Sequence, residues 1–362
     1  MDNCPKSPSP AAVHTRLSPT KNTSAFRAKM LAWFLAHQRK LPWRERPSLY
    51  KTVVSEFMLQ QTQVDTVLPY FAHWMQRWPD FTALATAETN EVVHAWEGLG
   101  YYNRARNLLR LAIQVAAMHE PPRTAAAWLA MPGVGPYTAA AIASLACGEN
   151  IAVVDGNVVR VLARLTADVR VFKSNGDAVK AFGGLAQALA NPANPGDHNQ
   201  AMMELGATIC RPRKPLCITC PVLEFCAASA CGTEEDFPHM APRNMQRLAL
   251  SRLWLVHDGR LLLQRHADSA RRLQGLHELP LLEIAGKAGQ DATLLARKRR
   301  AISNQQLEES CYRLDWTPAL GTRIATANDL HWIPLAELPS VTLSGPHRKW
   351  IPSLASFAEN SG

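Results

Sequence analysis

Hydrophobic positions recur with helical spacing through the first part of the chain. In AFRAKMLAWFLAHQ, Phe26, Met30, Trp33 and Phe34 follow the i, i+4, i+7, i+8 pattern of one helix face. The stretches ETNEVVHAWEGL, NRARNLLRLAIQVAAMH and GPYTAAAIASLAC continue the pattern, and turn signals containing Pro and Gly lie between them. We see no strand alternation from residue 25 to about 230, and we predict helices throughout.

The pattern changes after Cys231. GTEEDFPHMAPRNMQR is polar and contains prolines, so residues 233–250 are predicted to be a linker. Two apolar runs then flank His257-Asp258-Gly259, which is a hairpin signal. LHELPLLEI, CYRLDWTPAL and LHWIPLAEL read as further strands or strand ends.

The expected fold is therefore mainly α, with a second, smaller α+β domain. A helical domain over residues 25–232 precedes the linker, and the α+β domain covers 251–362. The tail over residues 1–24 is rich in Pro, Ser and Lys and is predicted to be disordered. The chain has 362 residues, enough for two domains of ordinary size.

The charge balance is basic, with 39 Lys+Arg against 30 Asp+Glu and a formal charge of +9. This permits binding to nucleic acid or to an anionic membrane, and proves neither. No apolar run approaches the roughly 18 residues of a membrane span, and the N-terminus has no apolar core of a secretory signal. We expect a cytoplasmic, nucleoid-associated protein with no membrane partner.

Four of the eight cysteines lie close together, with spacing C-x6-C-x2-C-x5-C: Cys210, Cys217, Cys220 and Cys226. In a chain without an export signal this favours a metal site over disulfides. Four thiolates can hold zinc or a [4Fe–4S] cluster. The single CxxC unit and the compact loop favour the cluster. The neighbouring Arg211, Arg213 and Lys214 would make the loop electropositive.

Two lone carboxylates interrupt apolar stretches. Glu56 lies in VVSEFMLQQTQ, where a surface turn of an amphipathic helix is the simplest interpretation. Asp155 precedes a helix-like pattern in VVDGNVV, where an N-cap is the usual role of an aspartate. Between them, MPGVGPYTA places Gly133, Val134 and Gly135 before a helix. Such a turn exposes backbone N–H groups and suits a phosphate, although a plain helix–turn–helix is an equal alternative.

Together these features resemble the helix–hairpin–helix DNA glycosylases with an iron–sulfur loop, and among them the adenine DNA glycosylases of the MutY kind. The matching stretches are LPWR, SEFMLQQTQVDTVLPYF, WEGLGYYNRARNL, MPGVGPYTAAAI, VDGNVVRVLAR, NQAMMELGATIC and the cysteine spacing. The resemblance implies two helical lobes with DNA between them. One lobe is expected over about 45–150, and the other combines 25–44 with 151–232 and holds a [4Fe–4S] cluster. The domain over 251–362 resembles the family's Nudix-like domain.

The family removes adenine mispaired with 8-oxoguanine, and the resemblance assigns catalytic roles to four residues. Glu56 would be the general acid with a raised pKa, and Asp155 would stabilise positive charge on the sugar. Asn157 and Tyr137 would support the site. Related bifunctional enzymes carry a lysine at the position of Tyr137, so we expect a monofunctional glycosylase with little strand cleavage.

The resemblance also implies DNA contacts, and it predicts a monomer on double-stranded DNA carrying an adenine:8-oxoguanine or adenine:guanine mispair. Gln61, with Leu59 nearby, would wedge into the base stack. Tyr101 would touch the 8-oxoguanine strand, unless it is a buried aromatic. The remaining matches are the glycine turn over 133–135 and the adenine-pocket residues Arg44 and Gln200.

The chain departs from the family in the loop that contacts 8-oxoguanine. Where relatives often have Phe-Ser-His, the best alignment places Ile302-Ser303-Asn304, after the basic run over 297–300. Ser303 retains the serine of the family's loop, whereas the aromatic residue and the histidine are replaced. This departure bears on the recognition of 8-oxoguanine more than on catalysis. Two rivals are a thymine or oxidised-pyrimidine glycosylase on this scaffold and a non-catalytic iron–sulfur DNA-binding protein. The second has no need of Glu56 or Asp155.

Overall fold

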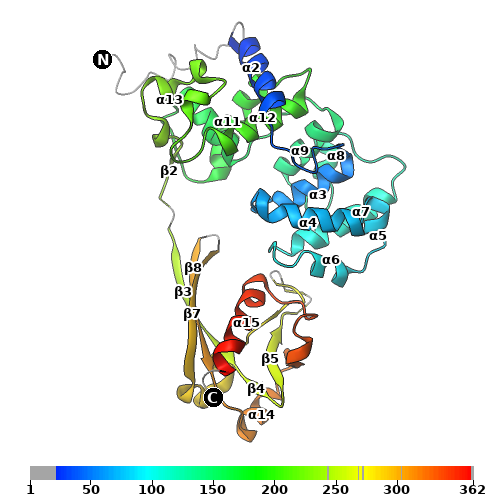
Figure 1. Ribbon diagram of the computed structural model, residues 1–362, viewed down its shortest axis with the longest axis vertical. Coiled ribbons are helices and arrows are strands. Elements are labelled where there is room, and N and C mark those ends of the chain that lie inside the picture. The colour runs from blue at the N-terminus through cyan, green and yellow to red at the C-terminus, as the bar shows by residue number, and fades with distance from the viewer. Residues whose placement is uncertain (1–21, 243, 268, 271–272, 303, 360–362) are drawn as a thin grey trace. The chain divides into compact units, whose positions relative to one another are not determined.

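The computed structural model describes residues 22–359 except positions 243, 268, 271, 272 and 303. Contacts within the chain group the described residues into two compact units (Figure 1). The helical unit comprises 22–86 and 110–242. The mixed unit comprises 87–109 together with the C-terminal residues from 243 onward. The helical segment 87–109, expected within the first lobe, thus groups with the C-terminal residues.

The helical unit consists of short helices joined by tight loops. They are α2 (Asn22–His37), α3 (Leu49–Leu59), α4 (Val64–Arg77), α5 (Phe81–Ala85), α8 (Ala125–Leu129), α9 (Pro136–Cys147), α10 (Gly156–Thr166), α11 (Asn175–Leu189), α12 (Pro195–Thr208) and α13 (Ala227–Ala230). α2 begins at Asn22, inside the range expected for the tail. In the part of the chain that the structure describes, no helix combines the length and apolarity needed to span a bilayer.

Helix ends follow local sequence signals. Ser48 caps α3 by accepting from Lys51 N at 3.2 Å, and Asp155 caps α10 by accepting from Val158 N at 2.7 Å. At the other end of a helix, Gly148 stops α9 in the left-handed conformation with φ 74°. That conformation costs glycine little, which explains the sharp end of the helix.

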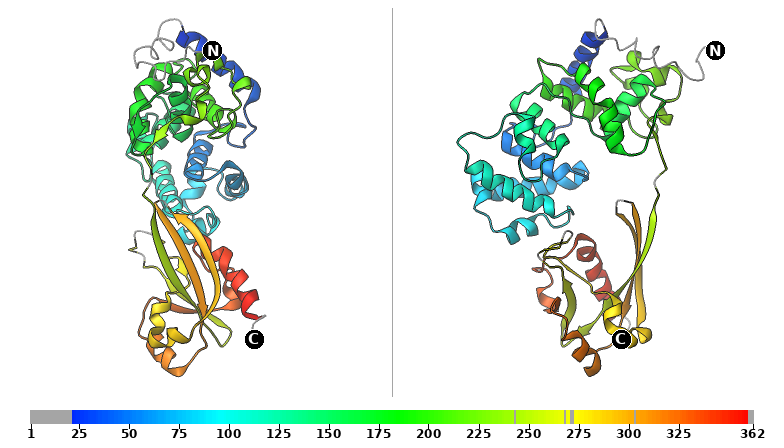
Figure 2. Two further views of the ribbon diagram at one scale, coloured as in Figure 1. Left: turned by 90° about the vertical axis from the view of Figure 1, so that its left-hand side faces the viewer. Right: turned by 180° about the vertical axis from the view of Figure 1, so that it is seen from behind.

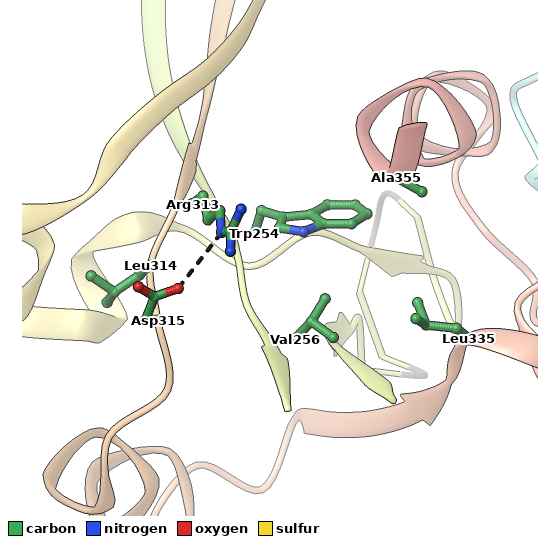
Figure 3. A pocket seen from close by; sticks show the side chains of 7 residues that line it. All are labelled: Trp254, Val256, Arg313, Leu314, Asp315, Leu335 and Ala355. Carbon is green, nitrogen blue, oxygen red and sulfur yellow. Dashed lines mark ion pairs between the residues drawn. The ribbon is translucent and has the colours of Figure 1, made fainter. Parts of the chain in front are cut away.

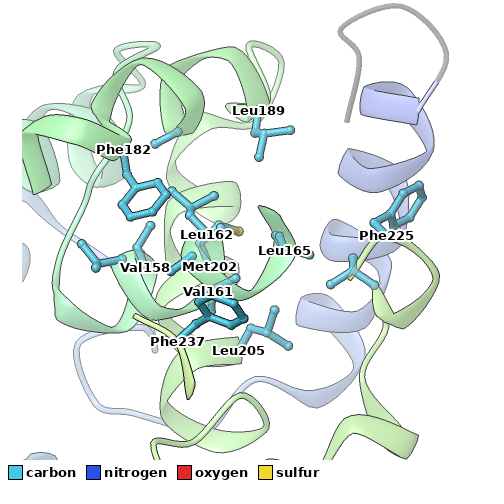
Figure 4. Packing of buried hydrophobic residues seen from close by; sticks show 14 of the residues in the cluster. Val158, Val161, Leu162, Leu165, Phe182, Leu189, Met202, Leu205, Phe225 and Phe237 are labelled. Atoms are coloured by element: carbon cyan, nitrogen blue, oxygen red, sulfur yellow. The ribbon is translucent and has the colours of Figure 1, made fainter. Parts of the chain in front are cut away.

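One hydrophobic cluster of the helical unit surrounds α10 (Figure 4). Val158, Val161, Leu162 and Leu165 recur at one-face spacing and are buried. Their neighbours come from α11, α12 and the C-terminal part of the unit, and include Phe182, Leu189, Met202, Leu205, Phe225 and Phe237. α12 packs against α2, α9 and α10. This packing determines where the first residues of α10 lie.

A short parallel strand pair departs from the all-helical prediction. β1 (Val171–Phe172) pairs with β2 (His239–Met240), within residues predicted as helix and linker. Two residues are too few to form an alternating pattern, and the pairing exists only because a distant segment returns to residue 171. The prediction of no strands before residue 230 is therefore wrong here.

The mixed unit contains two sheets. In the first, β3 (Gln246–Trp254) runs parallel to β8 (Gln305–Arg313), which pairs antiparallel with β7 (Thr293–Ile302). In the second, β5 (Arg260–Arg265) pairs with β4 (Val256–His257), β6 (His277–Glu278) and β9 (Leu330–Pro334). The helices are α6 (Thr89–Ala95), the start of α7 (Asn103–Ala116), α14 (Pro318–Ile324) and α15 (Gly345–Glu359). Figure 2 shows α15 beside the long strands, and it contacts β7.

The predicted hairpin at Asp258-Gly259 is confirmed. Both residues have positive φ, 47° and 68°, and β4 and β5 pair on either side of them. The apolar run before the turn, however, divides between β3 and β4, which lie in different sheets. The other three predicted strand stretches each contain strand residues first and helical turns afterwards. β6 is followed by η4 (Leu282–Asp291), β8 by α14, and β9 by η5 (Leu335–Glu337).

One close approach gives a stability test. A Cβ on Gly206 of α12 would lie 2.6 Å from Asn157 Cβ and 3.0 Å from the Asn157 carbonyl oxygen. Gly206→Ala is therefore expected to destabilise the protein by about 1–3 kcal/mol, as overpacked core sites do. Denaturant unfolding measures this change.

The matched control is Gly184→Ala, in the middle of α11. A Cβ there meets no atom within 4 Å. Because alanine is the better helix former, this variant should gain about 0.5–1 kcal/mol. Equal stability of the two variants would contradict the packing of α12 against α10.

Candidate active site

Glu56 lies on the buried face of α3 and is 6% exposed. Burial raises the pKa of its carboxyl group to about 7. A hydrogen bond from Tyr137 opposes the shift, the charge of Asp155 adds to it, and the charge of Arg44 opposes it. The interpretation of Glu56 as a surface residue is therefore wrong, and three other predicted site residues, Tyr137, Asp155 and Arg44, act on its carboxyl group.

Tyr137 is the second residue of α9, which packs against α3. Burial raises the pKa of its phenol well above the usual value, so the hydroxyl stays neutral. It also lies 3.4 Å from Met203 Sδ. Gln60 Nε2 donates to Thr138 Oγ1 at 3.1 Å and ties the end of α3 to the same helix.

The glycine turn comes directly before α9. Gly133 has φ 74°, Val134 is 8% exposed, and Gly135 is the N-cap residue of the helix. Pro136 then starts the helix at a position where its missing N–H costs nothing. The turn thus presents backbone at the N-terminus of the helix that carries Tyr137.

Asp155 serves as a helix cap and also belongs to the carboxyl site. Its Oδ1 accepts from Val158 N at 2.7 Å and its Oδ2 accepts from Asn157 Nδ2 at 2.9 Å. Arg160 Nη2 in turn donates to Asn157 Oδ1 at 2.9 Å. The cap interpretation is therefore confirmed, and capping is what holds Asp155 close enough to affect the pKa of Glu56.

Two side chains outside the predicted site fix the segment before Asp155. Buried Asn199 accepts from Val153 N at 3.0 Å and donates to the Ile151 carbonyl at 2.8 Å. Gln187 likewise accepts a hydrogen bond from the backbone N–H of residue 152 and donates one to the carbonyl of residue 150. These side-chain amides satisfy backbone groups that no helix or strand pairs, and so fix the segment that leads to Asp155.

Arg44 and Gln200 meet beside a buried glutamate. Arg44 Nε donates to Gln200 Oε1 at 2.7 Å, and its Nη2 donates to Glu204 Oε2 at 3.0 Å. Arg39 Nε donates to Glu204 Oε1 at 2.7 Å. Burial raises the pKa of Glu204, but the hydrogen bond from Arg39 and the two arginine charges outweigh it, so the pKa is lowered.

Sequence reasoning missed Arg39 and Glu204, although a signal was present. NQAMMELGAT contains one carboxylate among apolar residues, as SEFMLQQT does. The two carboxylates differ in their surroundings. Glu204 accepts hydrogen bonds from two arginines and remains charged. Glu56 accepts a hydrogen bond from a phenol, but burial outweighs it and favours the protonated form.

The end of α3 presents Leu59 and Gln61. Leu59 is half-buried, while Gln61 is exposed in the left-handed conformation with φ 56°. A non-glycine residue rarely adopts this conformation, which marks the position as locally strained.

The four cysteines of the loop are free thiols, and Arg164 organises their loop. Arg164 is 2% exposed and donates to the carbonyls of Arg211 at 2.7 Å and Pro212 at 3.0 Å. Its Nη1 lies 3.3 Å from Cys210 Sγ. Burial raises the pKa of Cys220 to about 12, and neighbouring cysteine charges add to the shift.

The donor set therefore fits an iron–sulfur cluster in number and type. Four thiols lie on one loop, close enough to affect one another's ionisation. Among the described residues, however, no three His, Cys, Asp or Glu side chains are arranged as ligands of one metal ion. Arg160 links this loop to the carboxyl site, because its Nε donates to the Cys210 carbonyl at 2.8 Å.

Tyr101 lies in the mixed unit and is 54% exposed, with φ 49°. The buried-aromatic alternative is therefore wrong. Arg104 supports the loop: it is 8% exposed and donates to the carbonyls of Leu99 at 3.0 Å and Gly100 at 3.1 Å. Its guanidinium carbon also lies 5.6 Å from the centre of the Tyr101 ring.

The Ile302-Ser303-Asn304 departure lies where the chain passes from β7, which ends at Ile302, to β8, which begins at Gln305. Ile302 pairs with Gln305, and the Asn304 carbonyl accepts from Gln246 N at 2.9 Å. Ser303 lies outside the described residues.

The basic run before Ile302 does not form one patch. Lys298 lies 5.6 Å from the Trp350 ring centre and Arg300 donates to Glu309 at 2.6 Å. Arg299 alternates with them along the strand and donates to Glu308 at 2.9 Å.

The mixed unit also contains a cavity of about 300 Å³ (Figure 3). Its lining residues are Trp254, Val256, Arg313, Leu314, Asp315, Leu335 and Ala355. Arg313 and Asp315 form an ion pair with 3.6 Å between Nε and Oδ1. None of the predicted site residues that the structure describes lines this cavity, and Glu56, Tyr137 and Asp155 are not part of it.

The fold and the carboxyl site correspond to a known class of repair protein. Residues 54–173, which contain Glu56, Tyr137 and Asp155, match the HhH-GPD superfamily of base excision DNA repair proteins. The adenine DNA glycosylase of Homo sapiens is 47% identical over 216 residues, covering 57% of this chain and 39% of that protein. That of Mycolicibacterium smegmatis is 39% identical over 229 residues, covering 61% and 74%. The chain belongs to the adenine DNA glycosylase family.

Two further comparisons concern the length of the relatives and the fold of a solved structure. The chain spans well under half the length of its mammalian relatives, 39% for human and 44% for Rattus norvegicus. The structure of a thermostable thymine-DNA glycosylase aligns with TM-score 0.50 and 29% identity, covering 58% of this chain and 97% of that chain. The scaffold is therefore similar to that of a protein with a different named substrate.

The pKa of Glu56 predicts a trade-off between stability and function. The carboxyl group ordinarily titrates at 4.5 and here at about 7, so the folded state holds the proton more tightly than the unfolded state. The resulting cost to stability is absent below 4.5, grows between 4.5 and 7, and is complete above 7. Glu56→Gln is expected to raise the free energy of unfolding at pH 8 by about 2–3 kcal/mol, and much less at pH 5.

Denaturant unfolding at the two pH values measures this difference. Glu88→Gln, at an exposed glutamate, is the matched control and should change little at either pH. A Glu56→Gln effect that is the same at pH 5 and pH 8 would contradict a raised pKa.

Proposed function

We propose that this chain is a monofunctional adenine DNA glycosylase of base excision repair, which removes adenine mispaired with 8-oxoguanine or guanine. The observation that carries the proposal is the buried Glu56 carboxyl group, with a pKa of about 7, beside Tyr137 and Asp155. Membership of the adenine DNA glycosylase family supports the choice of base.

The first step is protonation of the base. Adenine leaves poorly as an anion, so a positioned acid must supply a proton to the ring as the glycosidic bond breaks. An ordinary glutamate is ionised at neutral pH, whereas Glu56 holds its proton to about pH 7. The target nucleotide must first leave the base stack to reach a buried acid.

The second step is stabilisation of the sugar. Breaking the bond leaves positive charge on the deoxyribose ring, and a nearby carboxylate lowers the energy of that state. Asp155 takes this role, held by its cap bond to Val158 N and by Asn157. A water molecule then adds to the sugar and its proton returns to solvent, which leaves free adenine and an abasic site.

Tyr137 makes the reaction monofunctional. Strand cleavage through a Schiff base requires an amine at the sugar, and a neutral phenol cannot form one. The phenol instead donates its hydrogen bond to Glu56 and stabilises the carboxylate after proton transfer. This stabilisation favours transfer of the proton to the base, and because the pKa of Glu56 is still about 7, solvent reprotonates it before the next turnover.

The remaining predicted residues are assigned to DNA. The turn over 133–135 takes a backbone phosphate at the N-terminus of α9. The exposed Gln61, with Leu59, enters the base stack, while Arg44 and Gln200 line the adenine pocket. In the mixed unit, the exposed Tyr101 contacts the lesion strand together with Ile302 and Asn304, and Ser303, which lies outside the described residues, is assigned to the same contact from the sequence.

A [4Fe–4S] cluster on Cys210, Cys217, Cys220 and Cys226 is part of the proposal. When bound, the cluster would supply cross-links that fix the loop carrying Arg211, Arg213 and Lys214. These exposed basic side chains suit DNA phosphates, and the loop connects to the carboxyl site through Arg160.

A thymine glycosylase is the second candidate, because the scaffold is similar to that of a thymine-DNA glycosylase. A binding protein without activity is disfavoured by Glu56, because burying this carboxyl group costs stability above pH 7 and brings no binding benefit.

Duplexes with adenine opposite 8-oxoguanine, guanine or thymine, and with thymine opposite guanine, test the proposal. We expect breaks only after alkali and the fastest release opposite 8-oxoguanine. Glu56→Gln should lower the rate by about 10²–10⁴-fold and still bind the duplex. The parent rate should fall as pH rises through about 7, because only the protonated form of Glu56 is active.

Glu88→Gln is the control and should keep the parent rate. Release of thymine without adenine would favour the second candidate. Binding without release of either base would favour a binding protein, and breaks before alkali would contradict the monofunctional assignment.

Removal of one thiol tests the cluster. Cys220→Ser is expected to lose the iron, the acid-labile sulfide and the visible absorption of the parent, which should carry about four irons per chain. Cys147→Ser, at a free cysteine outside the loop, should retain them. Zinc with no sulfide in the parent would overturn the assignment.

A further inference from the structure

Side chains on both sides of Tyr101 hold its loop to the C-terminal residues of the mixed unit. On one side, Glu97 accepts from Arg348 Nε at 3.0 Å and from Arg348 Nη2 at 2.8 Å. On the other side, the Tyr102 hydroxyl donates to the Leu343 carbonyl at 3.1 Å. Tyr101 therefore lies between two anchors.

Both backbone polar groups of Leu343 are bonded to this loop. Its N–H donates to Glu97 Oε1 at 2.9 Å, and its carbonyl accepts from Tyr102. A third bond joins Arg106 Nη2 to the Gln274 carbonyl at 2.6 Å. These side chains form hydrogen bonds with backbone groups that a neighbouring strand would otherwise pair. The loop therefore has a defined position although it belongs to no sheet.

The ion pair between Glu97 and Arg348 is largely shielded from solvent, and its geometry is fixed by further hydrogen bonds. Glu97 and Arg348 side chains are 8% and 26% exposed, and the contact is a two-pronged guanidinium–carboxylate pair. Arg348 also donates to the carbonyls of Leu338, at 2.8 Å, and Val341. These bonds fix the guanidinium before it meets Glu97, which reduces the entropy lost in forming the pair.

The loop needs such anchors because its own conformation is unfavourable. Gly100 and Tyr101 both have positive φ, 72° and 49°, while the Tyr101 ring remains 54% exposed. A tyrosine in this region of backbone space is strained, and it persists only where its surroundings determine it. Glu97 and Tyr102 provide those surroundings.

We propose that Glu97 is a positioning residue for recognition of the base opposite adenine. Through Arg348 and the Leu343 amide it fixes the loop that presents Tyr101. The inference rests on the proposed function, in which Tyr101 contacts the 8-oxoguanine strand. Loss of the pair therefore weakens the preference for 8-oxoguanine and leaves the acid chemistry at Glu56 unchanged.

The test compares single-turnover rates of adenine release opposite 8-oxoguanine and opposite guanine in Glu97→Gln. Glutamine keeps the shape and removes the charge. We expect the ratio of the two rates to fall by about tenfold, the scale of one charge-assisted hydrogen bond, while the rate opposite guanine stays within about twofold. Hydrogen exchange of the Leu343 amide should become faster at the same time.

Two further variants separate positioning from general stability. Arg348→Met should lower the same ratio, and the double variant should lower it by less than the two single effects combined, because both variants remove the Glu97–Arg348 contact. Asp315→Asn removes an ion-pair partner elsewhere in the unit and should leave the ratio and the Leu343 exchange unchanged.

An unchanged ratio in Glu97→Gln, with a parent that is active on both duplexes, overturns the positioning role alone. A fall of both rates by the same factor also overturns it, because that result indicates lost stability. A parent that releases adenine from neither duplex refutes the proposed function, and this inference with it.

Discussion

The proposed active site depends on keeping one carboxyl group out of water. Glu56 lies on the buried face of α3, and its burial raises its pKa to about 7. The neighbours divide into two groups with opposite effects: Tyr137 and Arg44 lower the pKa, and Asp155 raises it. The balance leaves an acid that gains and loses a proton near neutrality, which is the property required of a general acid.

The two carboxylates of α3 and α12 illustrate how surroundings set chemical roles. Glu204 is as well buried as Glu56, yet Arg39 and Arg44 keep it ionised and structural. Arg44 touches Gln200 and Glu204 and also acts on Glu56 through its charge. One guanidinium thus joins the predicted adenine pocket to the acid.

Buried and half-buried arginines hold several loops and strands of both units in place. Arg164 holds the cysteine loop, Arg160 joins that loop to Asn157, and Arg104 supports the turn at Tyr101. In the mixed unit, Arg252 bridges Glu278 and Glu309 at the base of the long strands. Each donates several hydrogen bonds from one planar group, so it can fix irregular backbone that no sheet or helix would satisfy.

The sequence alone determined the helical spacing of Phe26 to Phe34, the cap at Asp155, the hairpin at Asp258-Gly259 and the four-thiol loop. These signals are local, because they depend on residue spacing and on turn chemistry. The burial of Glu56, the pairing of β1 with β2, and the anchors of the Tyr101 loop are different. They depend on residues far away in the chain, such as Arg348 for Glu97. Only the tertiary structure decides them, because a carboxyl group's pKa and a loop's position are set by what packs against them.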